Sequence, residues 1–228
     1  MIKDITPATG IANHRPAPDA DRPIVVIADD HKNMRAALEE LFESVGIDTL
    51  SFENARLLLD SSLPDRPGCF ILDVRMPGPS GLDLQAQLVE KGYLMPIIFV
   101  TGHGDVPMSI RAIKAGAFDF KSKPVRDQDL LDAVSAAIDS DRHRRAVVRI
   151  EKESLAKFST LTPRERQVLK RIVSGLLNKQ IAYELDVTSA TIKLHRGSVM
   201  KKMEVGSVAE LVRMWDHIPP AIRQGDAA

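Results

Sequence analysis

The sequence predicts a doubly wound α/β domain with a five-stranded parallel sheet, followed by a small all-α domain. From residue 24 to about 140, short apolar runs alternate with amphipathic stretches, as expected for parallel strands covered by helices on both faces. From residue 158 onward, only short helical patterns remain. Charge divides the chain at a similar point, because residues 1–140 carry 14 Lys and Arg against 21 Asp and Glu, whereas residues 141–228 carry 17 against 10. A basic second half is typical of a segment that binds nucleic acid.

The first strand is the run I-V-V-I-A at 24–28, whose continuous β-branched residues are typical of a strand buried on both faces. Apolar residues then recur at helical spacing from Met34 to Val45, and Gly46 ends that helix. The cycle repeats along the chain. It predicts strands at 47–51, 69–72, 96–100 and 118–120, and helices at 53–60, 81–90, 106–116 and 127–139.

The second half contains a predicted helix-turn-helix unit. T-P-R-E at 162–165 is a capping box with Pro at the first helical position, so a helix begins there and stops at Gly175. The next helix, N-K-Q-I-A-Y-E-L at 178–185, is expected to be capped by Asn178. After the short turn D-V-T comes a longer helix, and a short helix, a tight turn and a longer helix form the motif. The last two predicted helices are 189–203, with Thr188 as its N-cap, and 207–217.

The segments between and around these two domains are polar. The N-terminal stretch lacks a secretory apolar core and is interpreted as a flexible tail. The charge-rich stretch 141–157 lacks Pro and Gly, and could be a flexible linker or a continuation of the preceding helix. No apolar run approaches the ~20 residues that span a membrane, and the single cysteine excludes an internal disulfide. The predicted organisation is a tail at 1–22, a first domain at 23–140, a linker at 141–157, a second domain at 158–222 and a tail at 223–228.

Polar side chains follow four of the five predicted strands. Asp29 and Asp30 come directly after the first strand, Asp73 after the third, Thr101 after the fourth and Lys123 soon after the fifth. In an open α/β sheet, ligands bind beyond the carboxyl ends of the strands, where the winding reverses. Each residue alone could be a helix cap or a turn residue, but their common edge predicts a single site.

Three carboxylates at this edge would need a cation. At a separation of about 4 Å, each pair would repel by roughly 4 kcal/mol at an effective dielectric constant of 20. Oxygen ligands with room for water favour Mg²⁺ over zinc. A carboxylate nucleophile with Mg²⁺, an ammonium and a hydroxyl suits phosphoryl transfer. We therefore expect Asp73 to form an aspartyl phosphate.

Residues 23–140 resemble the receiver domain of bacterial two-component response regulators, of the FixJ/NarL type, whose fold is flavodoxin-like. The resemblance lies in L-D-V-R-M-P-G-P-S-G, F-V-T-G-H-G-D-V-P-M and A-G-A-F-D-F-K-S-K-P. It implies that Asp73 is the phosphoacceptor. The implied Mg²⁺ ligands are Asp29, Asp30, Asp73 and the backbone carbonyl of Arg75.

The same resemblance assigns three further residues near the phosphoacceptor. Thr101 would bond a phosphoryl oxygen, and Lys123 would pair with the phosphate. Phe120 falls at the position of a switch aromatic, and for Phe120 taken alone a core aromatic of the fifth strand remains a reasonable interpretation. It has no hydroxyl to take part in a rotamer switch.

A haloacid-dehalogenase-type phosphatase also uses an Asp that follows a strand. That family needs a second acid two residues further on as the general acid for turnover, whereas Arg75 occupies this position here. The sequence therefore favours a lasting phosphoryl signal over a fast catalytic intermediate, and we expect the chain not to be an enzyme.

The candidate recognition helix is S-A-T-I-K-L-H-R-G-S-V-M-K-K-M at 189–203. At 100° per residue, Ile192, Val199 and Met203 share one face, which is the core side. The opposite side can enter a major groove, and it carries Ala190, Lys193, Leu194, Gly197 and Lys201. A lysine there can donate to guanine edges or to phosphate, and a leucine can contact a thymine methyl.

The stretch from L-T-P-R-E-R-Q-V-L through N-K-Q-I-A-Y-E-L-D-V-T-S-A-T-I-K-L-H-R is similar to the LuxR-type DNA-binding domain over its full length. Thr188, Ser189 and the N-terminus of the helix could bind DNA phosphate. The similarity adds Lys179, His195 and Arg196 as contacts to the DNA backbone. Gly197 offers no side-chain contact to a base, so specificity would depend on Lys193, Leu194 and DNA shape. The candidate DNA-binding residues are Lys179, Thr188, Ser189, Thr191, Lys193, Leu194, His195, Arg196 and Lys201.

The two resemblances together imply a cytoplasmic bacterial transcription regulator. A sensor histidine kinase would phosphorylate Asp73, and the phosphorylated chain would form a homodimer through the surface of 106–116 and 118–120. The homodimer would bind double-stranded promoter DNA and act on RNA polymerase, with no membrane partner. Two alternatives remain open: a DNA-binding protein whose receiver is a constitutive dimerisation module, and a receiver that acts by protein–protein contact, with DNA binding secondary.

Overall fold

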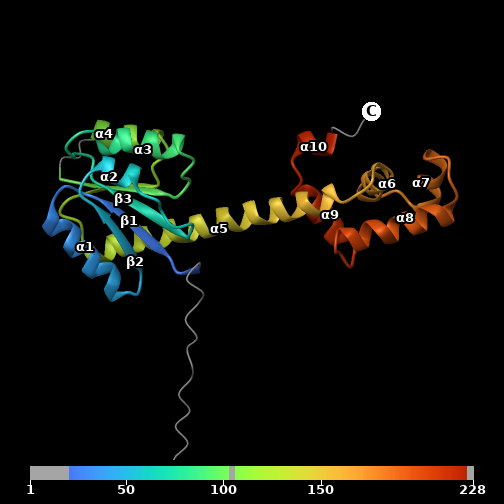
Figure 1. Ribbon diagram of the computed structural model, residues 1–228, viewed down its shortest axis with the longest axis horizontal. Helices are drawn as coiled ribbons and strands as arrows, with labels where there is room; N and C mark the ends of the chain where they lie inside the picture. Colours follow the sequence, from blue (N-terminus) through green and yellow to red (C-terminus); the bar gives the residue numbers. More distant parts are fainter. Residues whose placement is uncertain (1–20, 103–105, 225–228) are drawn as a thin grey trace, which may run out of the picture. The chain divides into compact units, whose positions relative to one another are not determined.

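The computed structural model describes residues 21–102 and 106–224, which belong to two compact units. The first unit extends to His143 and the second begins at Arg144. Figure 1 shows a sheet flanked by helices in the first unit and a cluster of helices in the second. The predicted fold classes of both halves are confirmed.

The first unit contains five parallel strands in the order β2-β1-β3-β4-β5. The strands are β1 (Ile24–Ala28), β2 (Asp48–Phe52), β3 (Gly68–Leu72), β4 (Ile97–Thr101) and β5 (Asp119–Ser122). The helices are α1 (Lys32–Ser44), α2 (Ala55–Asp60), α3 (Gly81–Glu90), α4 (Val106–Lys114) and α5 (Asp127–Ser159). The winding reverses between β1 and β3, because β1 has β2 on one side and β3 on the other.

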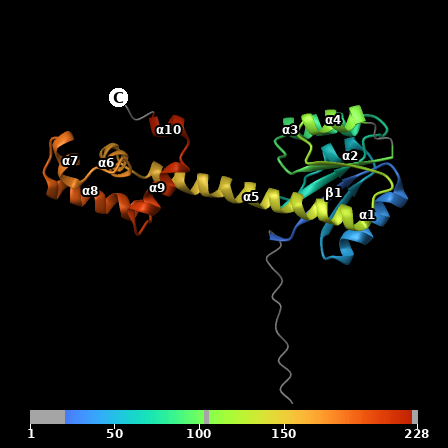
Figure 2. The ribbon, with the colours of Figure 1, turned by 180° about the vertical axis from the view of Figure 1, so that it is seen from behind.

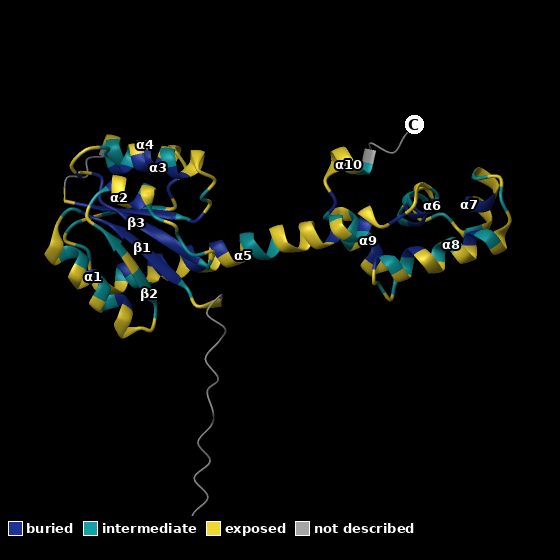
Figure 3. Ribbon diagram, viewed as in Figure 1, coloured by how far each residue is buried: buried dark blue, intermediate teal, exposed yellow. Residues whose placement is uncertain are grey.

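Helices cover both faces of this sheet. Helices α1 and α5 pack on one face, and α2, α3 and α4 pack on the other, as the two opposite views show (Figures 1 and 2). Every residue of β1, β3 and β4 is buried (Figure 3). This burial explains why these strands, apart from Thr101 at the end of β4, are apolar and show no polar alternation. Because helices cover both faces of these strands, the strand ends that carry the predicted site residues are held in place.

The stretch 141–157, for which the sequence left a flexible linker and a helical continuation open, is helical. It lies within α5, which extends to Ser159. The stretch has neither Pro nor Gly to end a helix. Within the first unit, the fully buried Asp141 accepts a hydrogen bond from the backbone N–H of Gly68 at 3.1 Å. In the second unit, the buried Phe158 of the same helix belongs to the core.

Two residues that were assigned to the predicted tails, Arg22 and Arg223, make contacts within the described units. Arg22 is held against the first unit, because its guanidinium lies 3.1 Å from Asp48 and its carbonyl accepts from Arg66 at 2.9 Å. At the other end, the helix α10 (Pro220–Gln224) includes Arg223, which pairs with Asp216 at 3.6 Å. The tail bounds 1–22 and 223–228 stay a prediction. The remainder of the predicted tails, 1–20 and 225–228, lies outside the described residues.

The second unit is a bundle of short helices around one apolar core. Its further helices are α6 (Pro163–Val173), α7 (Asn178–Glu184), α8 (Ser189–Lys202) and α9 (Val208–Asp216). The capping box of α6 is confirmed, because Thr162 and Glu165 exchange side-chain to backbone hydrogen bonds. The cap assigned to Asn178 is wrong. Leu177 is the N-cap of α7, and its backbone N–H donates a hydrogen bond to Gln180 Oε1 at 2.8 Å.

Glu165 also connects the start of α6 to the end of α8, through a 2.6 Å contact with Lys202 Nζ. Burial alone would raise the pKa of Glu165, but hydrogen bonds from Lys202 and Thr162 hold it below its usual value of 4.5. An acid with a lowered folded-state pKa stabilises the fold above its unfolded-state pKa. That stability is lost as the pH falls through the folded-state value.

We therefore expect Glu165→Gln to lower the stability of the second unit by about 1 kcal/mol at pH 7, since Lys202 is partly exposed and the amide can still accept from Thr162. The difference from the parent should shrink below about pH 4.5. The difference in unfolding free energy is measured at each pH by urea unfolding. The fluorescence of Trp215, which packs beside Phe158, reports the unfolding. A difference that is constant with pH would contradict the assigned pairing.

Candidate functional site

The ends of β1 and β3 place two buried carboxylates side by side. Asp29 and Asp73 follow paired strand residues, Ala28 and Leu72, at the point where the winding reverses. The backbone N–H of Asp73 donates to the carbonyl of Ala28 at 2.8 Å, which fixes the acidic residue to the end of β1. Both carboxylates are almost fully buried. The predicted convergence of strand-end acids is therefore present in the structure.

Lys123 lies between these two carboxylates. Its Nζ is 2.6 Å from Asp29 Oδ2 and 2.9 Å from Asp73 Oδ2. Burial alone would lower the pKa of Lys123, but the hydrogen bonds to Asp29 and Asp73 outweigh it and raise the pKa. A raised lysine pKa gives stability that is fully present below the unfolded-state pKa and lost as the pH rises through the folded-state value. The pairing is therefore intact at neutral pH.

Asp30 and His31 complete the acidic cluster. His31 Nδ1 lies 2.8 Å from Asp30 Oδ1 and 3.4 Å from Asp29 Oδ1. Asp30 Oδ1 is buried and lacks a hydrogen bond of good geometry to any described residue. Potential ligand atoms of Asp29, Asp30, His31 and Asp73 all lie within 4.8 Å of one another. An incompletely paired buried oxygen among carboxylates fits a hard divalent cation such as Mg²⁺.

The backbone around the acids is held by close contacts. The N–H of Arg75 donates to Asp73 Oδ1 at 3.1 Å, and Arg35 donates to the carbonyl of Asp29 at 2.7 Å. Gly81 begins α3 directly against this loop, and its N–H donates to the carbonyl of Val74 at 2.9 Å. A Cβ at Gly81 would lie only 2.2 Å from the carbonyl oxygen of Asp73. Glycine is thus required for this close approach.

A cavity of about 640 Å³ opens beside the acids. Asp30, Asp73, Thr101 and Lys123 line it together with Arg75. Thr101 is buried at the end of β4, and its carbonyl accepts from the N–H of Lys123 at 2.8 Å, so the ends of β4 and β5 are tied together. The predicted receiver-site residues, apart from Asp29 and Phe120, therefore share one cavity wall.

Phe120 does not line this cavity. It is partly buried, packs against the apolar core on the side of α2, α3 and α4, and has its ring centroid 6.2 Å from that of Phe99. This packing agrees with the core interpretation of Phe120. Its assignment as a switch aromatic stays a prediction.

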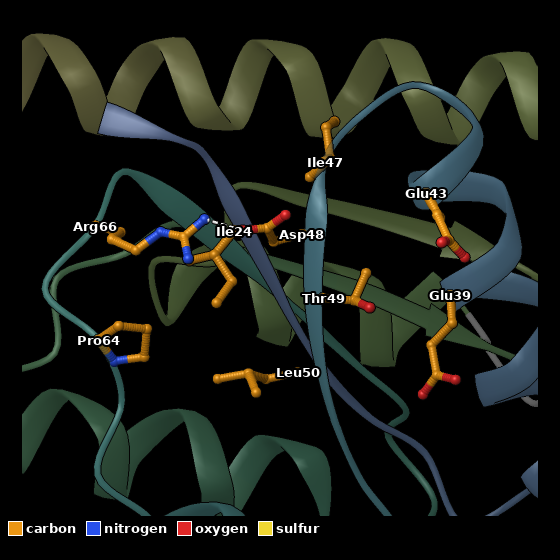
Figure 4. A pocket seen from close by; sticks show the side chains of 9 residues that line it. All are labelled: Ile24, Glu39, Glu43, Ile47, Asp48, Thr49, Leu50, Pro64 and Arg66. Atoms are coloured by element: carbon orange, nitrogen blue, oxygen red, sulfur yellow. Dashed lines mark hydrogen bonds and ion pairs between the residues drawn. The ribbon is translucent and has the colours of Figure 1, made fainter. Parts of the chain in front are cut away.

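A different hollow of about 520 Å³ lies along the β2 edge (Figure 4). Its wall includes Arg66, Asp48 and Leu50, and Figure 4 shows the Arg66 and Asp48 side chains paired with each other. Glu39, also in the wall, accepts from the hydroxyl of Ser51. None of the sequence-predicted site residues lines this hollow.

In the second unit, α8 presents the predicted polar face. Ile192, Val199 and Met203 are buried in the core, as expected from the helical spacing. On the other side, Lys193 and Lys201 are exposed, and Leu194 is 74% exposed. An exposed leucine of this size between basic residues is available for contact with a partner.

The remaining candidate residues divide into two groups. Thr188 caps α8, accepting from the N–H of Thr191 at 3.1 Å, and the two hydroxyls are 2.9 Å apart. Arg196 is half-buried and donates to Asn178 Oδ1 at 3.2 Å, which fastens α8 to α7. These three side chains therefore support the motif internally. Lys179 and Ser189 are exposed, and His195 is half-buried.

Comparison with known proteins identifies the class of this chain. Residues 25–135 match the family described as "Response regulator receiver domain", and residues 159–215 match "Bacterial regulatory proteins, luxR family". The chain belongs to the two-component response regulators that carry a LuxR-type DNA-binding domain. This family consists of transcription regulators, so the prediction that the chain is not an enzyme is confirmed and the phosphatase alternative is rejected.

Among individual relatives, the chain is 51% identical to "Nodulation protein W" of Bradyrhizobium diazoefficiens over 191 residues, which is 84% of each chain. Of the solved structures, response regulator StyR matches with a TM-score of 0.78 and 42% identity, covering 86% of this chain and 98% of StyR. Full-length FixJ from B. japonicum matches with a TM-score of 0.54 and 36% identity, covering 91% of this chain and 100% of FixJ. The predicted FixJ-type resemblance is thus confirmed.

Sequence reasoning missed three residues that shape the acidic site. His31 follows the acidic pair directly, and Arg35 lies one helical turn further on. Their positions in the sequence could therefore have indicated that they lie near the acids. Gly81 belonged to a recognised motif, but its contact with the Asp73 carbonyl depends on how α3 meets the β3 loop. Only the assembled structure shows that contact.

Proposed function

We propose that this chain is a phosphorylation-controlled transcription regulator whose phosphoacceptor is Asp73. The observation that carries the proposal is the Lys123 ammonium shared by Asp29 and Asp73 at the edge of a buried sheet. A bound phosphoryl group would need the same ammonium, so phosphorylation would redistribute contacts that now fasten β5 to β1 and β3. Residues 23–140 would act as the receiver and 158–222, extended to Gln224, as the DNA-binding domain, joined by 141–157.

In the proposed reaction, an oxygen of Asp73 forms a bond to phosphorus while the bond from phosphorus to a histidine nitrogen of the sensor kinase breaks. The leaving imidazole takes up a proton. Asp29, Asp30, Asp73 and the carbonyl of Arg75 would hold Mg²⁺, which offsets negative charge on the transferring oxygens when bound. Thr101 would donate its hydroxyl to a phosphoryl oxygen, and Lys123 would supply positive charge.

Dimerisation through α4 and β5 is supported by exposed apolar side chains on that part of the first unit. Ile110, Ile113 and Phe118 are large and exposed, and they lie on α4 and directly before β5. Large apolar side chains that are exposed to water favour association when they form one patch. The proposed partners are a sensor histidine kinase, promoter DNA, a second copy and RNA polymerase. These partners would meet in the bacterial cytoplasm.

The test treats the full chain and Asp73→Asn with acetyl phosphate and Mg²⁺. A phosphate-affinity gel reports modification, and light scattering after size exclusion reports mass. The parent should be modified and shift from monomer to dimer, and the variant should do neither, because its amide cannot form the acyl phosphate. A dimer that is independent of phosphate would support constitutive dimerisation. An unmodified, folded parent would contradict the proposal.

Base recognition by α8 gives a separate prediction. Lys193→Ala should weaken binding to a preferred duplex, selected from random sequences by the parent, about fivefold to a hundredfold, because a base-edge contact contributes about 1–3 kcal/mol. Lys152→Ala, which removes another exposed lysine, on α5, should change affinity much less. Fluorescence anisotropy at fixed salt measures both. Equal affinities would place base recognition outside Lys193.

A further inference from the structure

The outer edge of the sheet at β2 pairs with no strand among the described residues. The strand order places β2 at one end of the sheet, with β1 as its neighbour on one side only. An edge strand leaves a row of backbone N–H and carbonyl groups to which an extended peptide can bind. The other edge strand, β5, carries Lys121, and a charged side chain on an edge strand discourages such pairing. The middle of β2, Thr49–Ser51, has no charged residue.

The hollow of about 520 Å³ lies beside this edge. Thr49 and Leu50 line it, with residues of α1 on one side of the strand and Pro64 and Arg66 on the other (Figure 4). The Leu50 side chain is 37% exposed. An extended chain therefore has access to both the edge of β2 and an apolar side chain on it.

The charges that line the hollow are unbalanced. Arg66 pairs with Asp48, so these two charges offset each other. Glu39 and Glu43 lie one helical turn apart on α1, and neither forms an ion pair with a described residue. The hydrogen bond that Glu39 accepts comes from a neutral group, the hydroxyl of Ser51. Like charges at this spacing repel each other, so a cation placed near both carboxylates would be stabilising.

A second copy of this chain fits the hollow poorly. If β2 paired antiparallel with β2 of another molecule, a two-fold axis perpendicular to the sheet would place both α1 helices on the same face. Glu39 and Glu43 of one copy would then face the same carboxylates of the other, which is unfavourable. The two carboxylates thus disfavour self-pairing and favour a partner with basic residues.

We propose that the β2 edge binds an extended segment of another protein that carries lysine or arginine at alternate positions. The segment would lie beside β2 and exchange main-chain hydrogen bonds with it. Side chains of a strand alternate between its two faces. Those on the face of α1 would reach Glu39 and Glu43, and those on the opposite face would contact Leu50. This surface is separate from the acidic site and from α8, and the proposal does not depend on phosphorylation of Asp73.

The test titrates the full chain, labelled with ¹⁵N, with the acetylated and amidated peptide T-K-V-K-V-K-T. Two control peptides are used: one carries glutamate in place of each lysine, and one is N-methylated at its five central residues, which removes main-chain donors and keeps the side chains. The lysine peptide should shift the amide signals of Asp48–Phe52 in a saturable manner. Both controls should bind at least about tenfold more weakly. Equal affinities of the three peptides, or no saturable shift at millimolar concentrations, would overturn the proposal.

The location is tested with two charge reversals of exposed acids. Glu43→Lys changes the hollow, and Glu90→Lys makes the same change of net charge on α3, outside it. The first should weaken binding of the lysine peptide about threefold to tenfold and strengthen binding of the glutamate peptide. The second should change either affinity by less than about twofold. Equal responses of the two variants would overturn the assignment to this edge.

Two other occupants give distinct results in the same spectra. Shifts of the β2 amides that depend on protein concentration, without peptide, would assign the edge to a second copy. Peptide binding that appears only after deletion of residues 1–20 would assign it to the N-terminal segment of this chain. Either result would overturn the proposal.

Discussion

Replacing Lys123 by Met is expected to destabilise the first unit by about 3 kcal/mol at pH 7 in the presence of a chelator. The Lys123 side chain is 16% exposed, and it separates two carboxylates that are 4% and 5% exposed. Removing the ammonium leaves two buried negative charges with no cation between them. Loss of one partner from a buried ion pair is costly because the other charge stays desolvated.

This loss should depend strongly on divalent cations. Mg²⁺ bound by the acidic cluster would supply positive charge to the same carboxylates, so its addition should stabilise Lys123→Met more than it stabilises the parent. Hydrogen exchange of the β1 and β3 backbone amides, measured with a chelator and then with Mg²⁺, reports stability at the site itself. The variant should also respond poorly to acetyl phosphate, because the phosphoryl group loses its ammonium partner.

Lys121→Met is the matched control. Lys121 also pairs with an aspartate, Asp119, at 2.9 Å, but the two side chains are 30% and 33% exposed. A pair with this much solvent contact contributes about 0.5 kcal/mol or less. If Lys121→Met and Lys123→Met lost similar stability, or if Lys123→Met were as stable as the parent in chelator, the electrostatic account of the acidic site would be wrong.

The sequence allowed the sheet and the strand-end chemistry to be predicted because both follow from local patterns. Continuous apolar runs identified the strands that are buried on both faces, although the edge strand β2 begins one residue later than expected, at Asp48. The carboxyl ends of parallel strands must meet at one edge, so Asp29, Asp73 and Lys123 could be brought together without knowing the strand order. That inference required only that the strands be parallel within one sheet.

Features that depend on packing between distant segments could not be read in the same way. Whether α5 continued past residue 140 was undecided, because charge-rich helices and linkers have similar composition. The contact of Arg196 with Asn178, which connects α8 to α7, could not be foreseen from helical spacing, and the role of Arg196 in DNA binding stays a prediction. The hydrogen bond from Gln85 to the carbonyl of Ala115 joins residues that are thirty positions apart. Such pairings appear only once the elements are assembled.

The second large effect is expected at Gly81, where α3 begins against the loop that carries the phosphoacceptor. A Cβ added here would lie 2.2 Å from the Asp73 carbonyl oxygen and 3.0 Å from Asp73 C and Val74 Cα. All three neighbours are backbone atoms, so no side-chain rotation can relieve the clash. Either α3 or the Asp73 loop must move, and both are fixed by the hydrogen bond from Gly81 N–H to the Val74 carbonyl.

We therefore expect Gly81→Ala to lower the stability of the first unit by about 3 kcal/mol, at the upper end of the usual cost of overpacking. The rate of modification by acetyl phosphate should also fall, because a shift of the Asp73 loop changes its distance from Lys123. Gly102→Ala is the stability control at the same edge of the sheet, since its added Cβ would meet no atom of the described residues within 4 Å. Its stability should stay within about 0.5 kcal/mol of the parent. Urea unfolding by far-UV circular dichroism, with a phosphorylation time course, separates the two effects. If Gly81→Ala kept both the stability and the modification rate of the parent, the close approach of α3 would not be what positions Asp73.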